Sequence, residues 1–423
     1  MDFIKAQDKY YIKPLLSIVI PTRNRFEYVK SAIASILAIN DQRIELVIQD
    51  NSDLDELKSW INDNIIDSRL KYNYFNTPLS FVGNFSEGVE ASSGEYICII
   101  GDDDGINPEI IDAVSWLKQE NIDCLSVKNI VNYVWPDSGI PSTVFTKVTD
   151  GNLSLSYFNG NIVEANMSVQ LESFVRNGCS NYLNFNLPKL YHGIVRRQCL
   201  EEIHKISGYY FTGLSPDISV SISLACVVNR VVVTDYPLTL PGICGVSASV
   251  IEGLLKKNSK KLEDAPHFRN RGSYYWSDLV PRIYCVETIW ADSGIAALKQ
   301  MGREDLIKKI SLYKLAAYCI IANKGIINPV MTGFYKGLRI LNKNPIISTI
   351  QLLLFLLILK SKLYFKFLTR VCNRILMIIG IKKVVRINGL KNIIEASNAL
   401  SDLLNEKGFS FLQFTKINRE LKK

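Results

Sequence analysis

The feature that most constrains the fold is a regular alternation within the first 130 residues. Short apolar runs alternate there with segments whose apolar residues have helical spacing. Strands buried on both faces read as continuous apolar runs, so this alternation is typical of a parallel sheet covered by helices. The predicted strands are 16–20, 44–48, 70–75 and 96–100, and the predicted helices are 27–39 and 54–66. The sequence therefore predicts an α/β domain with a mostly parallel central sheet.

The rest of the chain divides into a loop-rich segment and a helical region. Residues 130–190 are rich in Asn, Ser, Gly and Tyr, which predicts loops with short strands. Apolar runs return over 191–250, with a predicted strand at 231–233 and a predicted helix over 217–227. Beyond about residue 255 the pattern becomes helical. We therefore expect an α/β domain over 1–255 and an α-helical C-terminal region over 256–423.

Polar clusters follow three of the apolar runs, at 22–25, 50–52 and 102–104. Open parallel sheets bind ligands at the carboxyl ends of their strands. In the third cluster three consecutive carboxylates, Asp102 to Asp104, repel one another and are costly to bury without a cation. Mg²⁺ and Mn²⁺ prefer oxygen ligands, commonly one or two carboxylates together with substrate phosphates. The cluster therefore predicts a Mn²⁺ or Mg²⁺ site, and the alternative is a solvated acidic turn.

Taken together, the segments SIVIPTRNR (17–25), LVIQDNS (46–52) and GEYICIIGDDD (94–104) resemble family 2 glycosyltransferases with the GT-A fold. The resemblance covers about the first 110 residues and continues more loosely to about residue 250. It implies an inverting hexosyl- or N-acetylhexosaminyltransferase whose donor is a nucleoside diphosphate sugar, typically UDP-linked. The implied acceptor is a hydroxyl of a glycan or lipid-linked glycan in surface polysaccharide biosynthesis.

The resemblance also implies roles for individual residues. Pro21 and Thr22 would border the nucleobase, Asp50 would accept a hydrogen bond from it, and the Asp cluster would contact the ribose and the metal. Gly101 departs from the usual Asp-x-Asp-Asp pattern, which leaves open which two carboxylates hold the metal. For Asp50, an Asx-turn or a helix cap is the alternative. The implied donor residues are Pro21, Thr22, Arg25, Asp50, Asp102 and Asp103, and the implied metal ligands are Asp103 and Asp104.

A general base is expected at Asp217. An inverting transfer needs a carboxylate to take the proton of the acceptor hydroxyl, and the family has one about a hundred residues after its metal motif. Asp217 follows Asp104 by 113 residues, and its alternative role is to cap a helix that starts after Gly213. Further candidates are His192 in the acceptor pocket and Arg196 or Arg197 on phosphate, with a core histidine and surface arginines as the alternatives. Residues 242–249 are expected to form a closing loop, and His267 to be a third metal ligand or part of a solvated loop.

Two other functions fit the sequence less well. A sugar-phosphate nucleotidyltransferase would need a glycine-rich phosphate loop after the first strand, and Pro-Thr-Arg-Asn-Arg contains no glycine. A non-catalytic scaffold bound to membranes would not need intact carboxylates at all three positions of the Asp102–Asp104 cluster.

Charge and hydropathy single out the C-terminal region. Between Leu306 and Ile394 there are sixteen Lys or Arg residues and no Asp or Glu. The apolar run 346–359 would extend about 21 Å as a helix, short of the roughly 30 Å of a bilayer core. Basic residues then recur every fourth position, at Lys362, Lys366, Arg370 and Arg374.

This pattern predicts that segment 346–378 lies on an anionic membrane surface. The alternative is a helical stripe that packs on itself or on a second copy in a homo-oligomer. Basicity mixed with apolar runs argues against nucleic acid as the partner. The first sixteen residues lack the apolar run of a signal peptide, and the nine cysteines are scattered. We therefore expect a cytoplasmic protein, peripheral on the inner face of the cell membrane.

Overall fold

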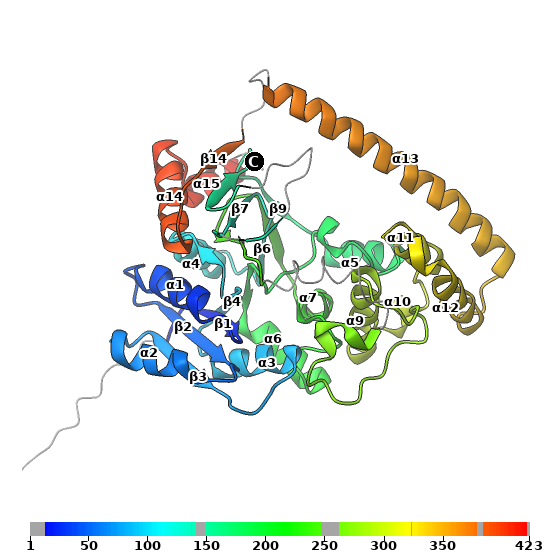
Figure 1. Ribbon diagram of the computed structural model, residues 1–423, viewed down its shortest axis with the longest axis horizontal. Coiled ribbons are helices and arrows are strands. Elements are labelled where there is room, and N and C mark those ends of the chain that lie inside the picture. The colour runs from blue at the N-terminus through cyan, green and yellow to red at the C-terminus, as the bar shows by residue number, and fades with distance from the viewer. Residues whose placement is uncertain are drawn as a thin grey trace, which may run out of the picture.

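The computed structural model describes residues 13–136, 138–140, 149–246, 262–322, 324–378 and 384–420 (Figure 1). Its centre is an eight-stranded sheet of order β3-β2-β1-β4-β10-β6-β11-β9. The strands are β1 (Leu16–Thr22), β2 (Ile44–Asp50), β3 (Leu70–Tyr74), β4 (Tyr96–Ile99), β6 (Cys124–Val127), β9 (Ile162–Glu164), β10 (Gly193–Arg196) and β11 (Val231–Thr234).

The predicted mostly parallel sheet is confirmed. β3, β2, β1 and β4 pair in parallel, as do β6 and β11, whereas β10 is antiparallel to both β4 and β6 and β9 is antiparallel to β11. The four strands predicted in the first hundred residues all form within two residues of their expected ends. Their carboxyl ends consequently meet at one edge of the sheet.

Helices cover both faces of this sheet, which explains why its central strands are mostly apolar. Alternate residues of one strand enter two different cores: Val19 packs with one set of helices, and Ile18 and Ile20 pack with the other. The helices on the Val19 side are α3 (Phe81–Ala91), α5 (Met167–Arg176), α6 (Arg197–Ser207) and α7 (Pro216–Val227), and those on the Ile18 side are α1 (Phe26–Leu37), α2 (Glu56–Asn64) and α4 (Ile110–Gln119).

Two small sheets flank the carboxyl edge. β5 (Gly105–Ile106) pairs with β12 (Thr239–Leu240), and a four-stranded sheet has the order β13-β7-β8-β14. Its strands are β7 (Val131–Val134), β8 (Asn152–Leu155), β13 (Gly242–Ile243) and β14 (Val385–Ile387). The short strands expected in 130–190 are therefore present, and α5 is a helix that the polar composition of this segment did not reveal.

The helical region begins after the segment 247–261, so the boundary expected near residue 255 lies outside the described residues. It contains α9 (Val286–Gln300), α10 (Glu304–Ile307), α11 (Leu312–Ala322), α12 (Ile327–Ile340) and α13 (Pro345–Ile378). α9 packs directly on α7, and both contribute to the same core as the Val19 face of the sheet. This region is therefore continuous with the α/β domain.

α13 is a single 34-residue helix that extends beyond the rest of the molecule (Figure 1). Its first half packs on α11, where Leu352 is buried and the Phe355 ring lies 5.6 Å from that of Tyr318. The most apolar 18-residue window within residues 345–372 has a mean hydropathy of 1.9, and 11% of that window is buried. By length and composition this stretch could cross a membrane, and its low burial distinguishes it from the core helix of a soluble protein.

The end of the chain returns to the α/β domain, unlike the single helical region expected over 256–423. β14 pairs with β8, the Tyr133 hydroxyl donates to the Leu390 carbonyl at 3.0 Å, and α14 (Ile393–Glu406) packs on α1 and β5. α15 (Phe411–Glu420) packs on α4. An amphipathic pattern predicts such helices without specifying which surface they cover.

Candidate functional site

The three polar clusters meet at the carboxyl edge of the sheet. The parallel register of β1 and β2 places Thr22 beside Asp50, and β4 flanks β1 on the other side. The Thr22 hydroxyl donates to Asp102 Oδ2 at 2.7 Å, which joins the first cluster to the third. Sequence positions about 80 residues apart are thus adjacent because neighbouring parallel strands end together.

Arg25 lies between two of the three buried aspartates. Its Nη1 is 2.5 Å from Asp102 Oδ1, and its Nη2 is 3.0 Å from Asp103 Oδ2. Burial raises the pKa of Asp102 to about 7; Arg25 acts in the opposite direction, and the neighbouring charge of Asp103 adds to the increase. Burial and the charge of Asp104 also raise the pKa of Asp103. One guanidinium therefore does not balance the negative charge of the cluster.

Asp104 is held by four donors. Its Oδ2 accepts from the Gly101 amide at 2.6 Å and from the Tyr191 hydroxyl at 3.0 Å, and it lies 3.0 Å from His192 Nε2. Its Oδ1 accepts from the Gly242 amide at 2.7 Å. Burial opposes ionisation, yet His192 and the two amides hold the pKa of Asp104 below its ordinary value. This carboxylate is therefore ionised and fixed in orientation.

A hard cation is compatible with this cluster only if other groups complete its coordination. Within the described ranges, no three His, Cys, Asp or Glu side chains form a group able to hold a metal. The excess of buried negative charge and the oxygen donors suit Mg²⁺ or Mn²⁺, which commonly bind one or two carboxylates and take phosphate oxygens and water as the remaining ligands. Asp103 has fewer protein donors around its carboxylate than Asp104, so it is the more available of the two expected ligands.

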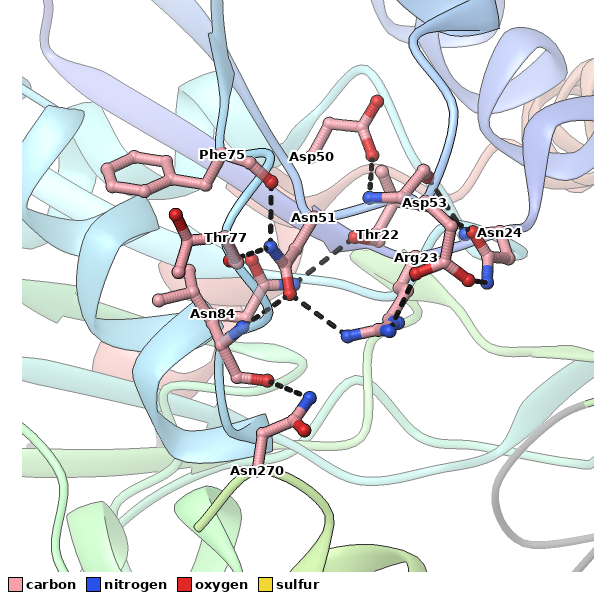
Figure 2. Close-up of polar contacts among 12 residues, drawn as sticks. Thr22, Arg23, Asn24, Asp50, Asn51, Asp53, Phe75, Thr77, Asn84 and Asn270 are labelled. Atoms are coloured by element: carbon pink, nitrogen blue, oxygen red, sulfur yellow. Dashed lines mark hydrogen bonds and ion pairs between the residues drawn. The ribbon is translucent and has the colours of Figure 1, made fainter. Parts of the chain in front are cut away.

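Asn51 fixes the ends of three strands relative to one another (Figure 2). Its Nδ2 donates to the carbonyls of Phe75 and Thr77 at 2.8 Å, and its Oδ1 accepts from the Leu79 amide at 2.8 Å and from Arg23 at 3.2 Å. It thereby ties the connection between β3 and α3 to the edge of the sheet. The sequence pattern at 50–52 does not reveal this role of Asn51.

Asp50 is fully buried beneath this network. Its Oδ1 accepts from the Ser52 amide at 2.8 Å, which is the Asx-turn weighed as its alternative role (Figure 2). Its Oδ2 accepts from the Tyr72 hydroxyl at 2.8 Å. The nucleobase contact of Asp50 remains a prediction.

A cavity of about 310 Å³ opens above the edge, at the lower end of the range for small-molecule sites. Four of the expected donor residues line it, namely Pro21, Thr22, Arg25 and Asp102. Sequence reasoning missed the rest of its wall, which includes the rings of Phe81 and Phe85, 5.1 Å apart, and Arg269.

Asp217 lies in the first turn of α7, near the aspartate cluster. Pro216 occupies the first position of the helix, and the N-cap is Ser215, so Asp217 does not cap the helix. The Ser293 hydroxyl of α9 accepts from the Leu214 and Ser215 amides at 3.1 and 3.0 Å, which fixes this turn.

Burial raises the pKa of Asp217 to about 6; His192 acts to lower it, and the charge of Asp104 adds to the increase. The carboxylate is therefore within electrostatic range of both residues. A buried carboxylate with a pKa near 6 is suited to take a proton at neutral pH.

Three secondary expectations are corrected. Arg196 bonds to Tyr96 and Arg197 to the Gly94 carbonyl and Ser92, all at the amino end of β4, so neither arginine faces the phosphate site. His267, in the turn Pro266–Phe268, is not in a solvated loop: it packs edge-on to Phe81, and burial lowers its pKa to about 4.

His192 is buried against Asp104 in a left-handed backbone conformation (φ 54°). The first residues of the expected closing loop, Gly242 and Ile243, form β13, and 247–249 lie outside the described residues.

Residues 17–145 match the family model described as glycosyl transferase family 2. A GalNAc(5)-diNAcBac-PP-undecaprenol beta-1,3-glucosyltransferase of Campylobacter jejuni is 34% identical over 96 residues, which are 22% of this chain and 30% of that protein. An uncharacterized glycosyltransferase of Haemophilus influenzae is 31% identical over 112 residues, 26% of this chain and 44% of that protein. The chain thus spans less than half the length of the curated relatives it matches.

Among solved structures, residues 1–349 of S. aureus TarS superpose with a TM-score of 0.40 at 17% identity, over 76% of this chain and 90% of that one. The same fragment in complex with UDP-GlcNAc gives 0.39 at 17% identity, over 78% and 93%. These superpositions are loose, so the assignment depends on the match to the family model and on the three motifs gathered at the sheet edge. Residues 17–145 contain those motifs and form a glycosyl transferase family 2 domain.

Proposed function

We propose that this chain is an inverting glycosyltransferase that moves a hexosyl or N-acetylhexosaminyl group from a nucleoside diphosphate sugar, with UDP as the nucleotide, to an acceptor hydroxyl. One observation carries the proposal: Asp217, with a pKa raised to about 6, lies within electrostatic range of an aspartate cluster at the carboxyl edge of the sheet. In this proposal, the base for the acceptor would therefore lie near the charged site for the donor.

The chain's own residues have separate tasks in this reaction. Thr22 and Arg25 hold Asp102 at the wall of the small cavity, where the nucleoside would lie. Asp217 takes the proton of the acceptor hydroxyl while the oxygen of that hydroxyl attacks the anomeric carbon from the side opposite the diphosphate. A single in-line displacement inverts that carbon.

Charge on the departing diphosphate has to be stabilised. Asp103, with Asp104 beside it, would hold Mn²⁺ or Mg²⁺, which when bound neutralises that diphosphate. The four donors around Asp104 keep its carboxylate ionised and oriented toward this position. Arg25 already contacts Asp102 and Asp103, so it supplies positive charge at the same place.

We further propose that α13 associates with the cytoplasmic face of the cell membrane and that the acceptor is a lipid-linked glycan used in surface polysaccharide biosynthesis. The support is the exposed apolar face of α13, which includes Leu353 (58% exposed), Leu357 (61%) and Phe365 (66%). The basic residues Lys362 and Lys366 of the same helix are also exposed. Basic residues contribute roughly 1 kcal/mol each near an anionic surface. The Campylobacter relative is named for an acceptor linked to undecaprenol, which agrees with this class.

Thermal unfolding in a panel of nucleotides, with and without Mn²⁺, tests the donor proposal. UDP and at least one UDP-sugar should raise the melting temperature more with Mn²⁺ than without, because a ligand that binds only the folded state stabilises it. Asp103→Asn should lose the Mn²⁺-dependent part, whereas Asp63→Asn, an exposed change on α2, should not. Stabilisation by a nucleoside triphosphate with a sugar phosphate would instead indicate a nucleotidyltransferase. A protein that no nucleotide stabilises would fit the non-catalytic scaffold.

A further inference from the structure

A second and larger cavity, of about 1110 Å³, lies between the α/β domain and the helical region. Its walls come from the start of α3, from the connection between α6 and α7, from residues 271–279 and from α9. Cavities at the junction of two structural regions are frequent ligand sites. Its volume is more than three times that of the small cavity at the sheet edge, so it can hold a ligand of several units.

The lining combines polar side chains with apolar surface. Thirteen of its twenty-two residues carry hydroxyl, amide or charged side chains. Two of the three acidic side chains have partners: Asp278 contacts Lys336 at 2.6 Å and the Tyr275 hydroxyl at 2.8 Å, and buried Asp292 accepts from Tyr274 and from the Ser277 amide. With these charges locally compensated, the cavity favours a neutral polar ligand over an ion.

Two tyrosines of this lining present large exposed surfaces. Tyr209 is 61% exposed and Tyr275 is 73% exposed. Tyr275 is held by its bond to Asp278, and the Lys299 ammonium lies 5.8 Å from its ring centre. Aromatic rings combine an apolar face with a polar edge, which suits a ligand that has both C–H faces and hydroxyl groups.

Hydrogen-bonding capacity on the same wall is unused. Thr212 is only 4% exposed, and its hydroxyl has no hydrogen-bond partner within the described structure. The Arg271 Nε is likewise unpartnered there, although its Nη2 donates to the Gly213 carbonyl at 3.1 Å. Buried polar groups normally have partners, so water or a polar ligand group that enters this wall would satisfy the two atoms.

The cavity is adjacent to both halves of the proposed catalytic centre. Ser80, the N-cap of α3, lines this cavity and the small one alike. The wall formed by Phe211, Thr212 and Gly213 continues into the first turn of α7, which carries Asp217. The Ser293 bonds fix that turn to α9, so the cavity and the base keep a constant separation.

We propose that this cavity binds the sugar units of the acceptor, as a neutral oligosaccharide that packs on Tyr209 and Tyr275. The inference rests on the proposed glycosyltransferase function and adds the substrate class of its second site. A saccharide, which has both C–H faces and hydroxyl groups, matches the mixed lining, the exposed tyrosines and the unused hydrogen-bonding groups.

Binding to an array of neutral and N-acetylated oligosaccharides of two to six units tests the proposal. We expect the wild-type chain to bind a subset of the array, and Tyr209→Ala and Tyr275→Ala each to weaken that binding about tenfold, the usual result of truncating an aromatic anchor. Tyr157→Ala changes a tyrosine that is 83% exposed elsewhere on the α/β domain, and it should bind as wild type does. Thr212→Val, which removes the unused hydroxyl at nearly constant volume, should also weaken binding.

The results separate this inference from the donor proposal. All four variants should keep the stabilisation by UDP, which shows that they are folded. The inference is overturned if the wild type binds no oligosaccharide, if the tyrosine variants bind as tightly as wild type, or if only a polyprenyl phosphate in detergent competes for the cavity. If oligosaccharides bind as expected while UDP stabilises nothing, the cavity is a saccharide site and the donor proposal fails instead.

Discussion

Replacing Asp217 by Asn should make the protein more stable and nearly inactive at the same time. The carboxylate is largely buried, and burial together with the charge of Asp104 outweighs the favourable effect of His192, so its pKa rises from 3.8 to about 6. The charged form is thus disfavoured in the folded state. Protonated Asp217 is tolerated in the folded state, so the group does not reduce the free energy of unfolding below about pH 4. That free energy falls as the pH rises to about 6, because the carboxylate must then be charged while buried.

The size of the effect follows from that shift. At about 1.4 kcal/mol per pH unit, it corresponds to about 3 kcal/mol above pH 6. Asp217 remains partly exposed, and its place in the first turn of α7 favours a negative charge by roughly 0.3–1 kcal/mol. We therefore expect Asp217→Asn to gain about 1–2 kcal/mol at pH 7.5 and nothing near pH 4.

Two measurements check this prediction. Thermal unfolding at several pH values should show a rise in melting temperature of a few degrees at pH 7.5, given about 2–4 °C per kcal/mol for domains of this size. Release of UDP from a UDP-sugar, with water as acceptor, should fall on the order of 10²–10⁴-fold, since the amide cannot take the proton. Asp63→Asn is the control and should change neither. A variant that is no more stable at pH 7.5 than at pH 4, or that turns over at the wild-type rate, would refute the reasoning.

Further predictions concern pH, metal and membrane. The rate of UDP release should fall as the pH drops through about 6, because protonated Asp217 is no longer a base, and a flat profile between about pH 5 and pH 8 would contradict this. Exhaustive chelation should abolish turnover, and Mn²⁺ should restore it; unchanged turnover would exclude a metal requirement. Asp103→Ala should weaken UDP binding in titration calorimetry more than Asp102→Ala, and the reverse order would assign the metal to Asp102. Changing Lys362, Lys366, Arg370 and Arg374 to Glu should release the protein from anionic vesicles in sedimentation assays without altering UDP binding, whereas complete sedimentation would indicate that the stripe is a packing surface.

Much of the α/β domain could be predicted because its information is local. The runs at 16–20, 44–48 and 96–100 are apolar except at Ser17 and Glu45, as expected of strands buried on both faces, and they become β1, β2 and β4. Pro216 after Gly213 and Ser215 indicated the start of α7 for a similar reason, since the first turn of a helix tolerates proline. From such strands, the gathering of Thr22, Asp50 and Asp102 follows geometrically.

The rest of the site depends on contacts that carry no local signal. Tyr191 and His192 reach Asp104 because β10 enters the sheet antiparallel between β4 and β6, and its sequence does not reveal that insertion. His192 also adopts a left-handed backbone conformation that non-glycine residues seldom occupy. Gly242 donates to Asp104 across 138 residues of chain. A pattern of residue types can identify a carboxylate cluster, but not the donors that orient it.

The position of α13 within the chain has a mechanical consequence. The chain packs on the body both before this helix, through α11 and α12, and after it, through β14 and α14. If α13 lies on a bilayer, the body of the protein would therefore be attached to it at both ends of this helix. Two attachments restrict rotation of the body relative to the membrane and so limit the orientations of the carboxyl edge of the sheet.

Ser397 and Ile393 of α14 lie directly behind Gly105, next to the aspartate cluster, so close that a β-carbon added at that glycine would lie 2.6 Å from the Ser397 hydroxyl oxygen. A truncation meant to detach the enzyme by removing everything after residue 344 would thus also remove the support of its own active site. A soluble version is better sought by deleting α13 and joining the end of α12 to the start of β14 with a linker.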